Sequence, residues 1–225
     1  MTRTTAAEAD ALWAGIDEER ERTAQLLERL APEQWEHPSL CEGWTVRHVA
    51  AHLTLQRERP RDAAAFVGRH PHLLRSRSLN AFIHDVAVVQ AELLSTQEVV
   101  GRIRAGIGSR RHNPFVTPLE TLTDILVHSQ DIAIPLGHEL DMAPGPSALA
   151  AARRWDTRGT WLARVNRRLP VEGYRLRASD IEWTRGDGPE VTGPVGALLL
   201  LLTGRPAALS HLSGEGADAL RLAEV

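Results

Sequence analysis

Two stretches of this chain carry histidine at helical spacing beside apolar residues, and this feature constrains the fold more than any other. The first stretch is residues 44–53 and the second is residues 117–128. In the second, Asp124 and His128 stand four positions apart, so they project from the same face of one helix. A buried carboxylate beside a buried imidazole needs a compensating charge or hydrogen bonds. The fold must therefore bring a partner to this pair.

The first stretch offers that partner. His48 and His52 are also four positions apart, and their neighbours do not decide which of them faces inward. Two histidines and one carboxylate bind a divalent metal ion and leave coordination positions open for chemistry. The alternative is a plain hydrogen bond between Asp124 and His128, because an acid four residues before a histidine is common in helices. Asp131 extends the polar row and would either orient His128 or cap the end of its helix.

Composition limits the class of protein. The 225 residues, 43% of them hydrophobic, suit one large or two small folded domains. The formal net charge of −3 argues against general binding of nucleic acid. The longest apolar run, residues 195–202, is too short to span a bilayer, and the amino terminus shows no secretory signal. Because Cys41 is the single cysteine, we expect a cytoplasmic protein with no internal disulfide. The charge and the short apolar run predict no nucleic-acid or membrane partner.

Periodicity and capping signals divide the chain into elements. They predict helices over residues 6–30, 46–57, 79–103 and 118–134. The last of these has the clearest start, since Thr117, Pro118 and Glu120 form a capping box with proline at the first helical position. Residues 58–76 are expected to be a long connection with at most one helical turn. Four helices in this order predict an antiparallel bundle over residues 1–140.

The chain changes character after a linker at residues 138–145. A helix is expected over residues 146–168. Short strands are expected over residues 174–178, 181–184 and 191–192, with a turn at residues 186–189, and two more helices over residues 194–202 and 217–223. Residues 146–225 are therefore predicted to form a small mixed α/β domain, which makes the whole chain an α+β protein. No exposed apolar face is evident, so the sequence is compatible with a monomer or a homodimer.

The residues around the histidines resemble a known family. Residues 40–53, Leu-Cys-Glu-Gly-Trp-Thr-Val-Arg-His-Val-Ala-Ala-His-Leu, are similar to the signature of the mycothiol-dependent maleylpyruvate isomerase family within the DinB-like superfamily. Residues 128–137 are similar to its second signature, and residues 186–194 and 201–205 to its third conserved block. The three blocks occur in the family's order. The resemblance implies a DinB-like four-helix bundle followed by a smaller domain.

The resemblance also implies a set of site residues. It assigns metal ligation to His52, Asp124 and His128, with zinc the expected ion, and places His48 outside the ligand set. The family usually has glutamate where this chain has Asp124, which is one methylene shorter. Arg205 is the candidate for holding a substrate carboxylate, because guanidinium pairs bidentately with carboxylates. Arginines between residues 57 and 77 are further candidates, and a solvated surface arginine is the alternative for any one of them.

The cosubstrate that the resemblance implies is the thiol mycothiol. A nearby divalent cation lowers the pKa of a thiol, so the reactive thiolate forms at neutral pH. The expected function is S-transfer to an electrophile or cis–trans isomerisation of a maleylpyruvate-like acid. The alternatives are a non-catalytic metal- or ligand-binding module and a metal-dependent hydrolase. Mycothiol belongs to actinobacteria, which agrees with the GC-biased genome indicated by 26 arginines without a lysine. Cys41 is expected to be a small packed loop residue instead of a functional thiol.

Overall fold

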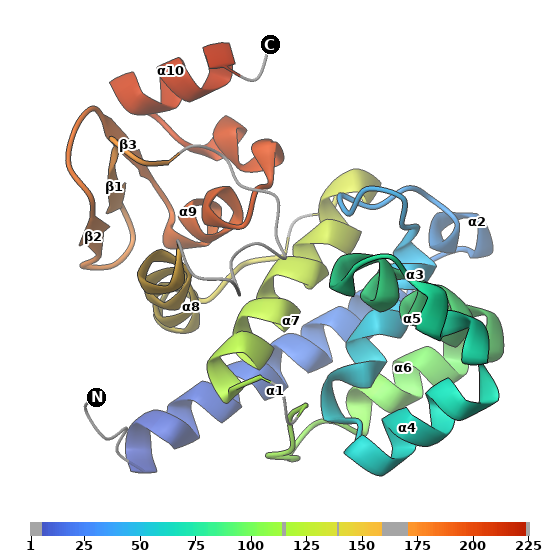
Figure 1. Cartoon of the computed structure of the whole chain (residues 1–225). Coiled ribbons are helices and arrows are strands. Elements are labelled where there is room, and N and C mark those ends of the chain that lie inside the picture. Colours follow the sequence, from blue (N-terminus) through green and yellow to red (C-terminus); the bar gives the residue numbers. More distant parts are fainter. Residues whose placement is uncertain (1–5, 114–115, 139, 159–170, 224–225) are drawn as a thin grey trace. The chain divides into compact units, whose positions relative to one another are not determined.

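The chain folds into two compact units, Met1–Leu140 and Asp141–Val225. The computed structural model describes residues 6–113, 116–138, 140–158 and 171–223 (Figure 1). The first unit is helical, and the second combines helices with a small sheet. The expected α+β class is confirmed. None of the helices in the described ranges is both long and apolar enough to cross a membrane.

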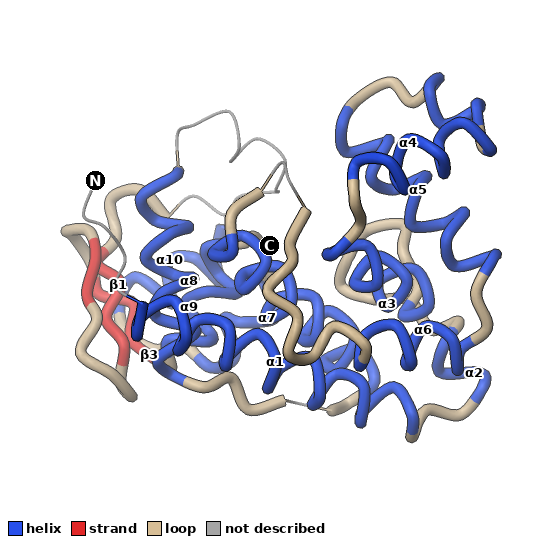
Figure 2. Tube along the Cα trace, turned by 90° about the horizontal axis from the view of Figure 1, so that it is seen from below, coloured by secondary structure: helices blue, strands red, loops and turns tan. Residues whose placement is uncertain are grey.

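The first unit is a helical bundle. Its long helices pack as α1 against α7, and as α3 against both α5 and α7, and Figures 1 and 2 show α1 running beside α7. Apolar side chains from all of these helices, among them Leu27, Val49, Ala87 and Ile125, share one buried core. In chain order the helices and 3-10 turns are α1 Ala6–Glu28, α2 Pro32–Trp35, α3 Val46–Leu53, η1 Thr54–Arg57, α4 Pro60–Arg69, η2 Pro71–Arg75, α5 Leu79–Leu93, α6 Thr96–Arg104, α7 Pro118–Ala133 and η3 Ile134–Leu136.

The single helix expected over residues 79–103 is wrong, because the chain breaks between α5 and α6. Leu94 takes an extended conformation (φ −111°, ψ 135°), and Ser95 begins a new helix as its N-cap. The Glu98 side chain accepts from the Ser95 backbone N–H at 2.8 Å, and the Ser95 hydroxyl accepts from the Glu98 N–H at 3.3 Å. This reciprocal capping box satisfies the first amides of α6. Its Ser-x-x-Glu pattern was the available sequence signal.

Replacing Ser95 with alanine is expected to lower the free energy of unfolding by about 1 kcal/mol, the usual cost of an N-cap. Urea denaturation followed by circular dichroism would measure it. Gln97→Ala is the matched control, because Gln97 is an exposed residue in the first turn of the same helix. Equal stability of the Ser95 and Gln97 variants would contradict the capping role.

The long connection expected over residues 58–76 is also wrong, since α4 and η2 occupy most of it. Pro60 is the first residue of α4 and Pro71 is the first residue of η2. Proline is favoured at this position because its fixed φ suits a helix and its missing N–H would be unpaired there. No residue of α4 is buried, so the apolar periodicity that reveals a buried helix is absent.

The second unit has helices packed on a three-stranded sheet of order β2-β1-β3. Strand β1 runs antiparallel to β2 and parallel to β3, and Leu176 pairs with Val191 in the parallel register. Both of these side chains are fully buried, and α9 packs on the same two strands. The elements are α8 Pro144–Thr157, β1 Arg175–Ala178, β2 Thr184–Arg185, β3 Glu190–Gly193, α9 Val195–Leu202, η5 Pro206–His211 and α10 Glu215–Ala223.

The expected elements of this unit are found with shifted ends. The helix expected over residues 146–168 begins at Pro144 and ends at Thr157, because Arg158 is extended (φ −61°, ψ 139°), and residues 159–168 lie outside the described residues. The second strand is shorter than expected and begins at Thr184, because residues 179–182 form a bend. Gly188 lies in the predicted turn with φ +118°, where a Cβ would meet the Gly173 carbonyl oxygen at 2.0 Å. Only glycine fits that position.

Candidate metal centre

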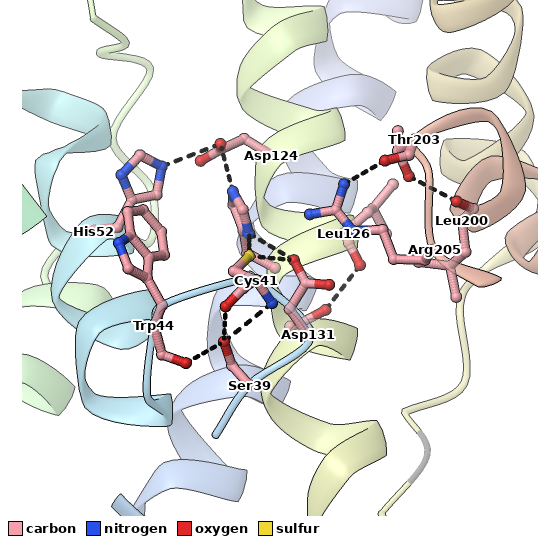
Figure 3. Close-up of polar contacts among 12 residues, drawn as sticks. Ser39, Cys41, Trp44, His52, Asp124, Leu126, Asp131, Leu200, Thr203 and Arg205 are labelled. Carbon is pink, nitrogen blue, oxygen red and sulfur yellow. Dashed lines mark hydrogen bonds and ion pairs between the residues drawn. The ribbon is translucent and has the colours of Figure 1, made fainter. Parts of the chain in front are cut away.

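Three polar side chains from two helices meet inside the first unit. His52 lies at the end of α3, and Asp124 and His128 lie one turn apart on α7. Oδ1 of Asp124 is 3.3 Å from Nε2 of His52 and 3.4 Å from Nε2 of His128. Figure 3 shows His52 and Asp124 pointing toward one another from the two helices. One carboxylate oxygen therefore faces both imidazoles.

These separations fit a shared cation. The three ligand atoms all lie within 4.8 Å of one another. Zinc binds imidazole nitrogen and carboxylate oxygen at about 2.0–2.1 Å, so two ligands at tetrahedral angles would lie about 3.4 Å apart. The two Nε2 to Oδ1 distances match that value. The side chains are 16–29% exposed, which leaves access for an outside molecule. The residues present thus fit a divalent ion with three protein ligands.

The protonation of the cluster agrees with a site for positive charge. Burial opposes the charged form of Asp124, but His52 and His128 outweigh it and hold the pKa of its carboxyl well below the usual value. Burial likewise opposes the charged form of His128, but Asp124 and Asp131 raise the pKa of its imidazole well above the usual value. The second proton of a charged His128 sits on Nε2, so it competes with a metal ion at that atom. Metal binding would therefore release a proton.

The structure distinguishes His48 from His52. Nδ1 of His48 accepts a hydrogen bond from the Thr45 backbone N–H at 3.1 Å, so this side chain caps the start of its own helix. His52, one turn later, is the histidine that reaches Asp124. The Trp44 ring lies beside the site, with its centroid 5.3 Å from that of His52 and 6.2 Å from that of His128. Trp44 is buried and gives the site an apolar wall.

Asp131 orients His128, which was one of the two roles expected for it. Its Oδ2 lies 2.8 Å from Nδ1 of His128, and the carboxylate is fully buried. An acceptor at Nδ1 fixes the tautomer that carries the lone pair on Nε2. Cys41 was expected to be only a packed loop residue, but its Sγ donates to the same Oδ2 at 3.1 Å and lies 3.6 Å from Nδ1 of His128. The Leu40 N–H also donates to the Asp131 carbonyl, which ties this loop to α7.

Comparison with known proteins shows the family of this chain. Residues 16–133 match the family described as the mycothiol maleylpyruvate isomerase N-terminal domain, over more than half of the chain. The chain belongs to this family. The family membership that the sequence motifs predicted is therefore confirmed. No curated protein gives a significant sequence match.

Two solved structures are similar to the whole chain. One is a crystal structure of the mycothiol-dependent maleylpyruvate isomerase, with 15% identity and a TM-score of 0.58 over 96% of this chain and 97% of that one. The other is a variant of that isomerase in which a histidine is replaced by alanine, with 14% identity and the same TM-score and coverage. At these identities the likeness shows a shared fold.

In this member of the mycothiol maleylpyruvate isomerase family, Gln56 holds the carboxylate of Asp124. The sequence analysis did not predict this contact. Nε2 of Gln56 donates to Oδ2 of Asp124 at 2.8 Å, and Oε1 of Gln56 accepts from the buried Arg20 guanidinium at 3.4 Å. Because a guanidinium only donates, it fixes the amide with its NH2 group toward Asp124. Oδ2 of Asp124 is thereby occupied, and Oδ1 stays available to bind a metal ion. The available signal was spacing, since Gln56 follows His52 by four positions.

Replacing Gln56 with leucine is expected to weaken metal binding about tenfold, because outer contacts that orient a ligand typically contribute this much. Competition with a chromophoric chelator would measure the dissociation constant. The matched control is Gln25→Leu, which alters an exposed glutamine on α1. Unchanged metal affinity in the Gln56 variant would show that the amide does not position Asp124.

Arg205, the predicted substrate-binding residue, lies in the second unit. Its Nη1 donates to the Thr203 carbonyl oxygen at 2.5 Å, at the turn that follows α9. This contact holds the guanidinium near its own turn within that unit. A role for Arg205 in binding substrate remains a prediction.

Proposed function

We propose that this chain is a metal-dependent enzyme that activates mycothiol for cis–trans isomerisation of a maleylpyruvate-like acid or for S-transfer to an electrophile. The observation that carries the proposal is that His52, Asp124 and His128 lie close together. They do so in a domain whose family is described by mycothiol and maleylpyruvate isomerase. Zinc is the ion that we expect, and the cytoplasm is the expected compartment. The solved isomerase with the same fold supports the isomerase reaction.

The chain's own residues would prepare the site in three ways. His52, Asp124 and His128 would hold the ion, which when bound supplies the positive charge that lowers the pKa of a thiol. Asp131 keeps the lone pair of His128 on Nε2, and Gln56 keeps Oδ1 of Asp124 turned toward the histidines. No cysteine of the chain is required, because the cosubstrate brings the sulfur.

The two reactions share their first chemical requirement, a mycothiol thiolate. In isomerisation the thiolate adds to a carbon of the cis double bond, the resulting single bond rotates, and loss of the same thiolate restores the double bond in trans. In S-transfer the sulfur stays on the electrophile, whose leaving group departs or whose double bond takes up a proton. The buried ring of Trp44 would shield the reacting sulfur from water. Arg205 is the residue that we propose for the substrate carboxylate.

Turnover assays on untagged, zinc-loaded protein test the proposal. We expect conversion of maleylpyruvate, or consumption of a bromobimane-type electrophile, only when mycothiol is present, and loss of conversion after treatment with a chelator. Conversion of substrate without any thiol would contradict thiol activation and indicate a hydrolase. Tight metal binding without turnover of either substrate would indicate a non-catalytic module.

A further inference from the structure

Arginines gather around a pocket in the first unit. The pocket has a volume of about 340 Å³, within the size range of small-molecule sites. Two segments line it, residues 57–60 and residues 110–112, which meet although they are far apart in the sequence. These segments contribute four arginines and one histidine against a single glutamate. The pocket is therefore strongly cationic, in a chain whose net charge is −3.

The positive charge of the pocket is only partly compensated by the protein. Arg110 pairs with Asp10 at 2.7 Å, and Glu58 offsets one further charge. The structure shows no ion pair between Arg57, Arg59 or Arg111 and any carboxylate in the described part of the chain. Four arginines against these two carboxylates leave two positive charges without a partner.

Arg57 and Arg111 line the pocket from the two different segments. Burial and then the charge of Arg111 lower the pKa of the Arg57 guanidinium from its usual value. Guanidinium groups that line one pocket attract an anion, since the anion reduces their repulsion and gains charge-assisted hydrogen bonds. Such an arrangement is typical of a binding site for an acid.

We propose that this pocket binds a small dicarboxylate. Each carboxylate can accept a bidentate pair of hydrogen bonds from one guanidinium, and each of the two lining segments contributes two arginines to the pocket. A dianion also matches the two uncompensated charges. Inorganic phosphate shares this charge, but its single compact group does not span two segments.

The pocket is distinct from the candidate metal centre. Arg57 directly follows Gln56 on the 3-10 turn η1, so the pocket begins one residue after the side chain that holds Asp124. None of the residues lining the pocket is a proposed metal ligand. The inference therefore does not rest on the proposed thiol chemistry, and the two can fail separately.

Calorimetric titration of maleate into the untagged protein tests the inference. We expect saturable binding that weakens at least about tenfold in the double variant Arg57→Gln/Arg111→Gln, because hydrogen bonds between charged groups contribute more than 1.4 kcal/mol. Arg75→Gln is the matched control, since Arg75 is an exposed arginine on η2 outside the pocket, and its affinity should equal that of the wild type. Thermal unfolding of each variant would establish that it is folded.

Two further titrations show where the ligand binds and which chemical class it belongs to. Maleate binding should persist in His128→Ala, because that variant lacks a metal ligand but retains the pocket. Phosphate should bind at least about tenfold more weakly than maleate. The inference is overturned by absence of saturable maleate binding, by unchanged binding in the double variant, by loss of binding in His128→Ala, or by phosphate binding as tightly as maleate.

Discussion

Replacing His128 with alanine is expected to abolish retention of the divalent metal, and replacing His52 should have the same effect. Each variant removes one of the three proposed ligands, and Nε2 of each histidine lies within 3.4 Å of Oδ1 of Asp124. The remaining pair cannot hold an ion against solvent at ordinary concentrations, so activity with mycothiol should fall to background. Elemental analysis of untagged protein should show about one ion per wild-type chain, as expected for a three-ligand catalytic site. The variants should contain only traces.

His84 provides the matched control for these substitutions. Its ring lies 5.9 Å from that of Trp44, close to the site, but its side chain is 41% exposed and points Nδ1 at Asp85. His84→Ala should retain the full metal content. Full retention of the ion by His128→Ala, or equal losses in all three histidine variants, would contradict the ligand assignment.

Asp131→Ala is expected to weaken metal binding by about 100-fold, the upper end of the range for groups that orient a ligand. The substitution removes the acceptor of Nδ1 of His128 and leaves that imidazole free to change its tautomer. It also leaves the Cys41 thiol without its hydrogen-bond acceptor on Asp131. Chelator competition would give the dissociation constant of the metal, measured above the pH at which His128 loses its proton.

Two companion variants separate orientation from general damage to the fold. Asp131→Asn keeps an acceptor oxygen for His128, so it should recover part of the affinity and weaken binding only about tenfold. Cys41→Ala removes a donor to Asp131 but leaves the contact between Asp131 and His128, so its metal affinity should stay close to that of the wild type. Equal losses in Asp131→Asn and Asp131→Ala would show that the acceptor is not what matters.

The sequence predicted much of the fold because the buried helices carry periodic apolar residues. The helix starts at Val46 and Pro118 and the buried helix α9 lie within one residue of their expected places. Two local features were overlooked. The capping box at Ser95 splits what looked like one periodic helix, and α4 buries none of its side chains, so no periodicity revealed it.

Spacing along one helix predicted only the pair Asp124 and His128 in the candidate site, and the family resemblance added His52. Asp124 and His128 lie on the same face of α7 whatever the tertiary structure is. Their proximity to His52 depends on how α3 packs on α7. Spacing did not decide between His48 and His52, and the resemblance selected His52. The contacts of Gln56 and Cys41 were missed because each acts through another side chain. The spacing of Gln56 four positions after His52 was the one signal that the sequence offered for them.

Anomalous diffraction at the metal absorption edge, from crystals of untagged protein, tests the central claim most directly. We expect one strong peak about 2.0–2.2 Å from Nε2 of His52, Nε2 of His128 and a carboxylate oxygen of Asp124. A second cluster, Cys41 with Nδ1 of His128 and Asp131, also brings three donor atoms within 4.8 Å of one another. A peak at that cluster, or no peak between His52 and His128, would contradict the metal centre that we describe.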